Sequence, residues 1–325
     1  MLVSILIPCY NSFQFIAETL DSLLVQTHTN WECIIVDDHS TDNSVEIINN
    51  YCEKYPGKIK LFTNPKKGAC SARNTAFEKC KGEYVKFLDA DDALFDENVI
   101  DFQLKYAKLF DYDIVYGNEY HYTENFEDEN LVKIYKPEIY NDTIATSFFR
   151  LRPITSNPLL KKSKIDFIRW NENLSAGQEK YFFIQCYLEG LTFSFLNINS
   201  AKIRKHNSPY RISNLDINSS ASRSLKSVEE LEKLLLLYKD TADKAFLLNW
   251  EFDKLATSYI TFGISKNLKC FLKINSNVQI KKEDIIKLPK KIKFLWQLNR
   301  LHPLVGLFWY FFNIKIIRHN IFKYI

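Results

Sequence analysis

Short apolar runs alternate with amphipathic stretches over the first 120 residues of this 325-residue chain. The runs have the length and composition of buried strands, and the stretches between them have helical spacing. Such alternation predicts an α/β fold, with a mostly parallel, Rossmann-like sheet flanked by helices. The expected strands are Leu2–Ile7, Trp31–Val36, Ile59–Phe62, Tyr84–Leu88 and Ile114–Tyr116, and the expected helices are Phe15–Leu24, Ser44–Tyr55, Ser71–Cys80 and Glu97–Phe110.

Polar residues follow three of these strands. They are Pro8-Cys9-Tyr10-Asn11, Asp37-Asp38-His39-Ser40 and Asp89-Ala90-Asp91-Asp92. In open α/β sheets, ligands bind outside the carboxyl ends of the strands. The three segments therefore predict a single cleft at that edge of the sheet.

The third segment, Asp89-Ala90-Asp91-Asp92, is called the acidic turn below. Carboxylates this close repel one another and raise each other's pKa unless a cation compensates. Mg²⁺ and Mn²⁺ do so readily, because they take oxygen ligands and bridge carboxylates to phosphates. A solvated turn that caps the next helix is the alternative interpretation.

Composition favours a folded protein of a reducing compartment. Aromatic residues make up 15% of the chain, whereas it contains only 8 Gly and 9 Pro. The seven cysteines are scattered and include no CxxC pair, which indicates reduced thiols rather than disulfides or a zinc site. The apolar start of the chain is too short for a signal peptide, and no run of eighteen apolar residues is present. We therefore expect a cytoplasmic protein.

Four motifs in order carry a family resemblance. They are Val3–Asn11, Ile35–Asp42, Gly68–Asn74 and the acidic turn, and neither GxGxxG nor a P-loop is present. Together they resemble the inverting family 2 glycosyltransferases of GT-A fold that build bacterial surface polysaccharide or lipopolysaccharide. The resemblance is strong over roughly the first 115 residues and weakens beyond about residue 210.

The resemblance implies a nucleotide site built from the first motifs. Pro8 and Tyr10 would pack on the base, and Asp38 or Asp37 would accept the base N–H. Arg73 near a helix start suits contact with the nucleotide or a phosphate. Ala76 stands where the family usually has Gly, a departure that affects packing more than chemistry.

The same resemblance assigns roles in the acidic turn and beyond it. Asp89 would contact the ribose, and Asp91 would bind Mn²⁺ or Mg²⁺ bridging the donor diphosphate, with Asp92 as support. His206, in Arg204–Ser208, would ligate the metal or bond a phosphate oxygen. A histidine in a basic loop can also be simply solvated.

The family's catalytic base is usually the second acid of a Glu-Asp pair at a helix start. This chain has Gln178 and Glu179 there, so we expect Glu179 to be the base, with one methylene more than the usual Asp. A first-turn Glu that complements the helix dipole is the alternative.

Beyond the resemblance, the domain organisation is expected to be 1–220 for the GT-A catalytic domain, with a nucleotide-binding half at 1–115 and an acceptor half at 116–220. A C-terminal helical extension, 221–325, would follow. Val228, Leu231, Leu234, Leu235 and Tyr238 make its first apolar stripe.

The tail combines basic and aromatic residues. Residues 281–325 contain ten Lys or Arg against two acidic residues, around the aromatic run Phe308–Phe312. This pattern suits an element lying on an anionic membrane surface, which predicts a peripheral protein on the inner face of the cell membrane. Packing on the catalytic domain or dimerisation is the alternative, and without a binding motif we expect no nucleic-acid partner.

The predicted function is therefore transfer of a sugar from a nucleotide-sugar, expected to be UDP-linked, to a glycan or lipid-linked glycan acceptor. Two rivals remain. A sugar nucleotidyltransferase would need a Gly-rich basic loop after the first strand, where this chain has Pro8–Asn11. A non-catalytic GT-A protein that binds a glycan or partner would show a decayed site, of which Gln178-Glu179 is the one hint.

Overall fold

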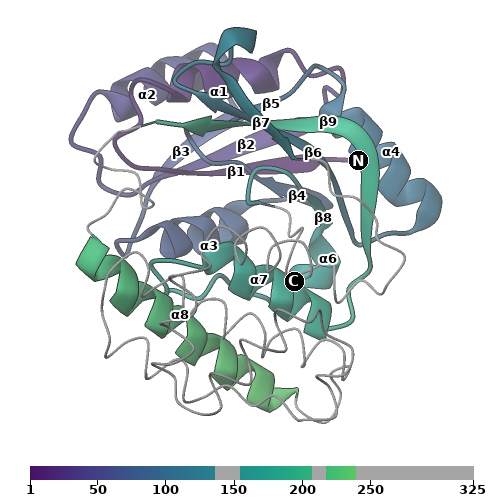
Figure 1. Ribbon diagram of the computed structural model, residues 1–325. Coiled ribbons are helices and arrows are strands. Elements are labelled where there is room, and N and C mark those ends of the chain that lie inside the picture. The colour runs from purple at the N-terminus through teal and green to yellow at the C-terminus, as the bar shows by residue number, and fades with distance from the viewer. Residues whose placement is uncertain (136–153, 207–216, 239–325) are drawn as a thin grey trace. The chain divides into compact units, whose positions relative to one another are not determined.

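The computed structural model describes residues 1–135, 154–206 and 217–238. They fall into two compact units, each described by itself. The first holds the described residues of Met1–Ile139 and Pro153–Asn214, including every strand of the described chain (Figure 1). The second holds helix α8, Ile217–Leu237. The domain boundaries expected from the sequence stay predictions.

The first half of the sheet is parallel, as predicted. Its four strands lie in the order β3-β2-β1-β4. In β1, β2 and β4 nearly all apolar side chains are removed from water, which is why these segments are mostly apolar rather than alternating, whereas the edge strand β3 is only partly buried. The strands are β1 (Val3–Cys9), β2 (Trp31–Asp37), β3 (Ile59–Thr63) and β4 (Tyr84–Phe87).

Helices cover this half on both faces. Helices α1 and α2 lie on one side of β1, β2 and β3, and α3 lies on the other (Figure 1). All four predicted helices are present to within two residues at each end: α1 (Ile16–Leu24), α2 (Ser44–Lys54), α3 (Ala69–Lys79) and α4 (Val99–Phe110). The α/β sandwich expected from the sequence is confirmed.

Strands of both directions complete a nine-stranded sheet. The full order is β3-β2-β1-β4-β8-β6-β9-β5, with β7 paired to β6. Strand β8 is antiparallel to both its neighbours, and β9 is parallel to β6 but antiparallel to β5. The added strands are β5 (Ala93–Leu94), β6 (Ile114–Thr123), β7 (Leu131–Tyr135), β8 (Leu159–Lys161) and β9 (Phe193–Lys205).

Strand β6 is longer than the sequence predicts. It continues from Tyr116 to Thr123 through Gly117, Asn118 and Glu119, residues that ordinarily end a strand. A Cβ on Gly117 would lie 2.7 Å from the carbonyl oxygen of Ile198, so the close pairing with β9 requires glycine. Because Asn118 and Glu119 are polar, the sequence pattern predicts that the strand ends before them.

Short elements lead to the long helix of the second unit. A 3₁₀ turn at Asp128–Asn130, α6 (Lys162–Ile165) and α7 (Gln178–Leu188) belong to the first unit. Four of the five predicted apolar positions are buried in α8: Val228, Leu231, Leu234 and Leu235. Tyr238 follows the end of the helix and is half-buried. No helix among the described residues is long and apolar enough to cross a membrane. The rest of the expected helical extension, from residue 239, and the basic aromatic tail lie outside the described residues.

Six of the seven cysteines are described, and all six are free thiols. Five of them are buried. Burial raises the pKa of Cys9 to about 12 and that of Cys70 to about 11, so these thiols are protonated at neutral pH. They fill the core, as expected from their scattered positions.

Candidate functional site

The loops that follow β1 and β2 are held together by hydrogen bonds. Asn11 has φ of 47°, and its side-chain oxygen accepts a hydrogen bond from Thr41 N at 2.7 Å. Its own backbone N donates to Ser40 Oγ at 2.9 Å. Asp38 N donates to the Cys9 carbonyl oxygen at 2.8 Å. The two strand ends therefore present their loops as one surface.

Pro8 and Tyr10 stand on this surface, and both are half-buried. The ammonium of Lys67 lies 5.4 Å from the centroid of the Tyr10 ring, within range of a cation–π interaction. Lys67 is exposed and comes from the loop before α3, so a third loop reaches the same place. An aromatic face and a cation side by side suit a ligand that has both a ring and a negative charge.

The two acids after β2 differ in their surroundings. The Asp38 carboxylate accepts hydrogen bonds from Asn64 Nδ2 at 2.6 Å and from Gly68 N at 2.9 Å. Gly68 has φ of 127°, a conformation that other residues rarely adopt. Asp37 Oδ2 accepts from Ser40 N at 3.0 Å, while its Oδ1 is buried with no hydrogen-bond partner among the described residues. Asp38 therefore shapes the loop before α3, and Asp37 keeps an unused acceptor.

The acidic turn contains one buried acid and two accessible ones. The side chains of Asp89 and Asp91 are 29% and 25% exposed, whereas Asp92 is 4% exposed. Asp92 accepts hydrogen bonds from Ser156 Oγ at 2.5 Å and from Arg204 N at 3.0 Å. Burial, followed by repulsion from Asp91 and Asp89, raises the pKa of Asp92 well above its ordinary value. Asp92 thus holds the turn in place.

Asp89 pairs with a buried arginine. Arg73 Nη2 donates to Asp89 Oδ1 at 2.7 Å, and Nη1 donates to Gln178 Oε1 at 3.0 Å. The guanidinium lies 4.6 Å from the ring centroid of Trp170, which fixes its plane. Burial raises the pKa of Asp89, the charge of Arg73 opposes that shift, and the charges of Asp91 and Glu179 add to it. Arg73 therefore compensates the charge of Asp89 in the acidic turn.

Asp91 pairs with His206. The distance from Asp91 Oδ2 to His206 Nε2 is 2.9 Å, although the two residues are far apart in the sequence. The imidazole packs against the ring of Phe15, with centroids 4.5 Å apart. Arg204, two residues before His206, donates through Nε to the Asp91 carbonyl oxygen at 3.1 Å and pairs with Glu18 of α1. The end of β9 is therefore tied to the acidic turn.

Glu179 lies in the first turn of α7, as predicted, and its neighbours define its position. Thr155 Oγ1 donates to Glu179 Oε1 at 3.2 Å. Gln178, which precedes Glu179, donates through Nε2 to the Leu174 carbonyl oxygen at 2.8 Å while it accepts from Arg73. Because Glu179 acts on the pKa of Asp89, the carboxylate of α7 lies within electrostatic reach of the acidic turn.

The structure thus brings the predicted residues to one edge of the sheet and adds residues that sequence reasoning missed. Thr155 and Ser156 belong to a polar stretch before Pro158 that reads only as a turn. Nothing in the local sequence distinguishes Trp170 and Phe15 from the many other aromatic residues of the chain. Their partners come from distant segments of the chain, so no local pattern identifies them.

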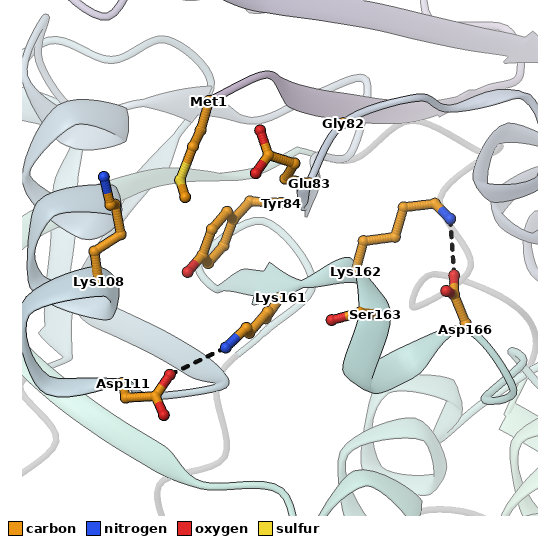
Figure 2. A pocket seen from close by; sticks show the side chains of 10 residues that line it. All are labelled: Met1, Gly82, Glu83, Tyr84, Lys108, Asp111, Lys161, Lys162, Ser163 and Asp166. Atoms are coloured by element: carbon orange, nitrogen blue, oxygen red, sulfur yellow. Dashed lines mark hydrogen bonds and ion pairs between the residues drawn. The ribbon is translucent and has the colours of Figure 1, made fainter.

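A separate pocket of about 450 Å³ lies at the opposite edge, where β1 and β4 begin. In Figure 2 two of its lysines are paired with acids, Lys161 with Asp111 at 3.0 Å and Lys162 with Asp166 at 2.7 Å. It contains none of the predicted site residues. Its lining residues are Met1, Gly82, Glu83, Tyr84, Lys108, Asp111, Lys161, Lys162, Ser163 and Asp166.

The geometry agrees with what comparison to known proteins finds. Residues 4–170, more than half of the chain, match the sequence profile of glycosyl transferase family 2. This chain belongs to that family. The match begins in β1 and ends at Trp170, so it contains the acidic turn and Arg73, while Glu179 and His206 lie beyond it.

Two curated relatives of this chain are named as glucosyltransferases. It is 34% identical over 165 residues to UDP-Glc:alpha-D-GlcNAc-diphosphoundecaprenol beta-1,3-glucosyltransferase WfgD of Escherichia coli, covering 50% of this chain and 57% of the relative. It is 32% identical over 200 residues to poly(ribitol-phosphate) beta-glucosyltransferase of Bacillus spizizenii, covering 60% of this chain and 31% of that protein. The match thus spans less than two thirds of either relative.

Solved structures share the fold. TarS 1-349 of S. aureus in complex with UDP-GlcNAc superimposes with a TM-score of 0.71 at 18% identity, covering 94% of this chain and 89% of that one. Mannosyltransferase PcManGT from Pyrobaculum calidifontis, in complex with GDP-Man and Mn²⁺, gives 0.57 at 14% identity, covering 94% and 85%. The GT-A fold expected from the sequence is confirmed.

The residues present fit a divalent metal that is shared with a substrate. Among the described residues, no group of three or more His, Cys, Asp or Glu side chains could hold an ion by itself. Asp91 and His206 nevertheless supply a carboxylate and an imidazole 2.9 Å apart. Mg²⁺ sites on phosphate substrates commonly use only one or two carboxylates, with the remaining ligands from phosphates and water. This donor set suits a metal that arrives with a diphosphate.

Proposed function

We propose that this family 2 member transfers a sugar, with inversion, from a UDP-sugar to a glycan or lipid-linked glycan of a cell-surface polymer. The observation that carries the proposal is the 2.9 Å pair of Asp91 and His206 beside the buried Arg73–Asp89 pair, with Glu179 in electrostatic reach. WfgD, whose name gives a UDP-Glc donor and a lipid-linked acceptor, and TarS, which binds UDP-GlcNAc, support it.

In this proposal the nucleotide lies on the loops after β1 and β2. Tyr10 and Pro8 provide apolar faces for the base, and Asp38 or Asp37 accepts its N–H group. The unpartnered Oδ1 of Asp37 and the engaged carboxylate of Asp38 favour Asp37 as the freer acceptor. Asp89, held by Arg73, would accept hydrogen bonds from the ribose hydroxyls.

Asp91 and His206 would hold Mn²⁺ or Mg²⁺ against the donor diphosphate. Bound there, the ion would stabilise negative charge on the departing nucleoside diphosphate. Arg73 is engaged with Asp89 and Gln178, so it would act mainly by keeping the acidic turn charged and oriented rather than by leaving its partners. His206 is fixed by Phe15, which keeps the pair in place before a substrate binds.

Glu179 would act as the general base. Inversion requires that the acceptor hydroxyl attack the anomeric carbon from the face opposite the leaving group and lose its proton as it does so. Glu179 would accept that proton on a carboxylate oxygen. Glu179 lies in the first turn of α7, on the same side of the site as the acidic turn whose Asp89 it influences.

The donor and the metal can be tested with the full chain. Hydrolysis of UDP-glucose, UDP-N-acetylglucosamine and GDP-mannose would be measured with Mn²⁺, with Mg²⁺ and with EDTA. We expect one UDP-sugar to be hydrolysed only with metal, and Asp91→Ala to lose at least about 100-fold in rate. Asp111→Ala, an acid of the opposite edge, is the control. Activity that survives Asp91→Ala would reject the metal site, and release of diphosphate from a sugar phosphate and UTP would indicate a nucleotidyltransferase instead.

The basic aromatic tail would place the enzyme on the inner face of the cell membrane, near a lipid-linked acceptor. Clusters of Lys and Arg beside interfacial aromatics bind anionic lipid surfaces. The check is flotation of the full chain and of a truncation after Leu288 with vesicles containing phosphatidylglycerol. A truncated chain that binds as well as the full one would reject this role.

A further inference from the structure

Residues Ile154–Asn157 form a segment between β4 and β6; Ile154 is half-buried and the other three are buried. Asn157 lies at its base: its Nδ2 donates to the Gly117 carbonyl oxygen at 2.8 Å and to Glu119 Oε1 at 2.9 Å. The Asn157 carbonyl oxygen in turn accepts from the ammonium of Lys86 and from Gln103 Nε2. All of these side chains are buried, so the segment is anchored to β4, β6 and α4 beneath the acidic turn.

The upper part of the segment presents two adjacent hydroxyls to the site. Ser156 Oγ donates to Asp92 Oδ2 at 2.5 Å and accepts from Asp89 N at 3.1 Å. Thr155 Oγ1 donates to Glu179 Oε1 at 3.2 Å. One peptide unit therefore connects the acidic turn to the carboxylate of α7.

We propose that Thr155 is a positioning residue for Glu179: its hydroxyl selects the side-chain conformation in which the carboxylate reaches the acceptor. This inference rests on the proposed function of Glu179 as base. Thr155 itself is 1% exposed and is held by its neighbour in the anchored segment, so it has little freedom to move.

A glutamate base needs such a restraint. The Glu side chain has three rotatable bonds, and ordering a side chain of this type costs about 1.5–2 kcal/mol. A base must lie within hydrogen-bond reach of the proton that it removes. Rotation about any of the three bonds displaces the carboxylate, and the hydrogen bond from Thr155 restrains the carboxylate directly. It also links Glu179 to the segment whose Ser156 contacts Asp89 and Asp92.

The test is a double-mutant cycle on hydrolysis of the UDP-sugar that the donor panel identifies. Thr155→Val removes the hydroxyl and keeps the shape; we expect kcat to fall about tenfold, the change of a lost hydrogen bond to a charged group, with donor KM and the Kd for UDP unchanged. Thr155→Ser keeps the hydroxyl and should keep most of the rate. In a Glu179→Gln background, Thr155→Val should change the remaining rate by less than twofold.

Each alternative result has a distinct meaning. If Thr155→Val lowers the rate tenfold in the Glu179→Gln background as well, or if Thr155→Ser loses as much as Thr155→Val, Thr155 does not act through Glu179 and the proposal is wrong. If Glu179→Gln is fully active, the base assignment fails instead. Thr192→Val is a matched control, because Thr192 Oγ1 donates to Asp113 Oδ2 at 2.9 Å at the start of β9, and it should leave kcat unchanged.

A second measurement does not depend on turnover. Crystal structures of the wild-type chain and of Thr155→Val, or of Thr155→Ala if the valine variant is poorly folded, would be compared at Glu179. We expect one conformer of Glu179 in the wild type and two or more in the variant. A single unchanged conformer in the variant would overturn the proposal.

Discussion

The two edges of the sheet treat their charges in opposite ways. At the carboxyl edge, burial raises the pKa of Asp89 and of Asp92, and neighbouring carboxylates add to both shifts. At the amino edge, a hydrogen bond from Lys161 lowers the pKa of Asp111, which lies open to water. The described pocket is at the amino edge, but the acids whose pKa is raised are at the carboxyl edge. The raised carboxylate pKa values, and not the pocket, coincide with the site proposed above.

The largest effect on this contrast is expected from removing Arg73, the cation that pairs with Asp89. Arg73→Met leaves Asp89 without its 2.7 Å partner in a mostly buried site. We expect the free energy of unfolding to fall by about 3 kcal/mol and kcat/KM for donor hydrolysis to fall about 100-fold. Urea unfolding and donor kinetics would measure the two effects.

Arg73→Lys separates charge from geometry. Lysine keeps the charge but cannot hold Asp89 and Gln178 from one planar group, so an intermediate loss is expected. Arg73→Met with unchanged stability and kinetics would remove the electrostatic distinction between the two edges.

Neutralising Asp92 should change how the free energy of unfolding depends on pH. Because the folded-state pKa of Asp92 lies above its unfolded value, the folded protein binds the extra proton, and the stability that this gives is lost as pH rises through the folded pKa. Asp92→Asn removes this loss. Its free energy of unfolding, relative to that of the wild type, should be higher at pH 8 than at pH 4.

The measurement is urea unfolding of both proteins across that range. Asn can still accept from Arg204 N through Oδ1, so the fold should persist. A difference that stays constant with pH would mean that Asp92 does not titrate as the structure implies.

The smallest effect is expected at the amino edge. Asp111→Ala removes the 3.0 Å pair with Lys161, in which the Asp111 side chain is 88% exposed. Exposed pairs contribute little because water screens them, so donor hydrolysis should be unchanged and Tm should shift by less than about 2 °C. A large loss of activity would show that the lysine-lined pocket also serves the reaction.

The parallel half of the sheet could be predicted because strands that are buried on both faces consist of local apolar runs. The runs at Val3–Cys9 and Trp31–Asp37 are mostly apolar, and polar residues of the candidate site follow their ends. Strand β8 could not be found, because three residues after Pro158 give no period. Strand β6 was cut short because its buried Asn118 and Glu119 resemble the end of a strand.

The site divides in the same way. Asp89, Asp91 and Arg73 lie in motifs that the sequence shows directly, and the pairing of Asp91 with His206 depends on β9 returning beside β5. The Thr155 and Ser156 contacts depend on a turn whose partners are up to 67 positions away. Contacts of this kind arise from the fold and leave no local signal.

Lys86 has one further consequence. Its ammonium is fully buried, and burial lowers the pKa of Lys86 to about 7, so near neutral pH a large share of the amine is unprotonated and chemically nucleophilic. No reagent can reach it while its contacts with Gln103 and Asn157 are closed. Lys86 can therefore report on local unfolding. The rate at which an amine-reactive probe modifies Lys86 would measure how often its buried contacts with Gln103 and Asn157 open.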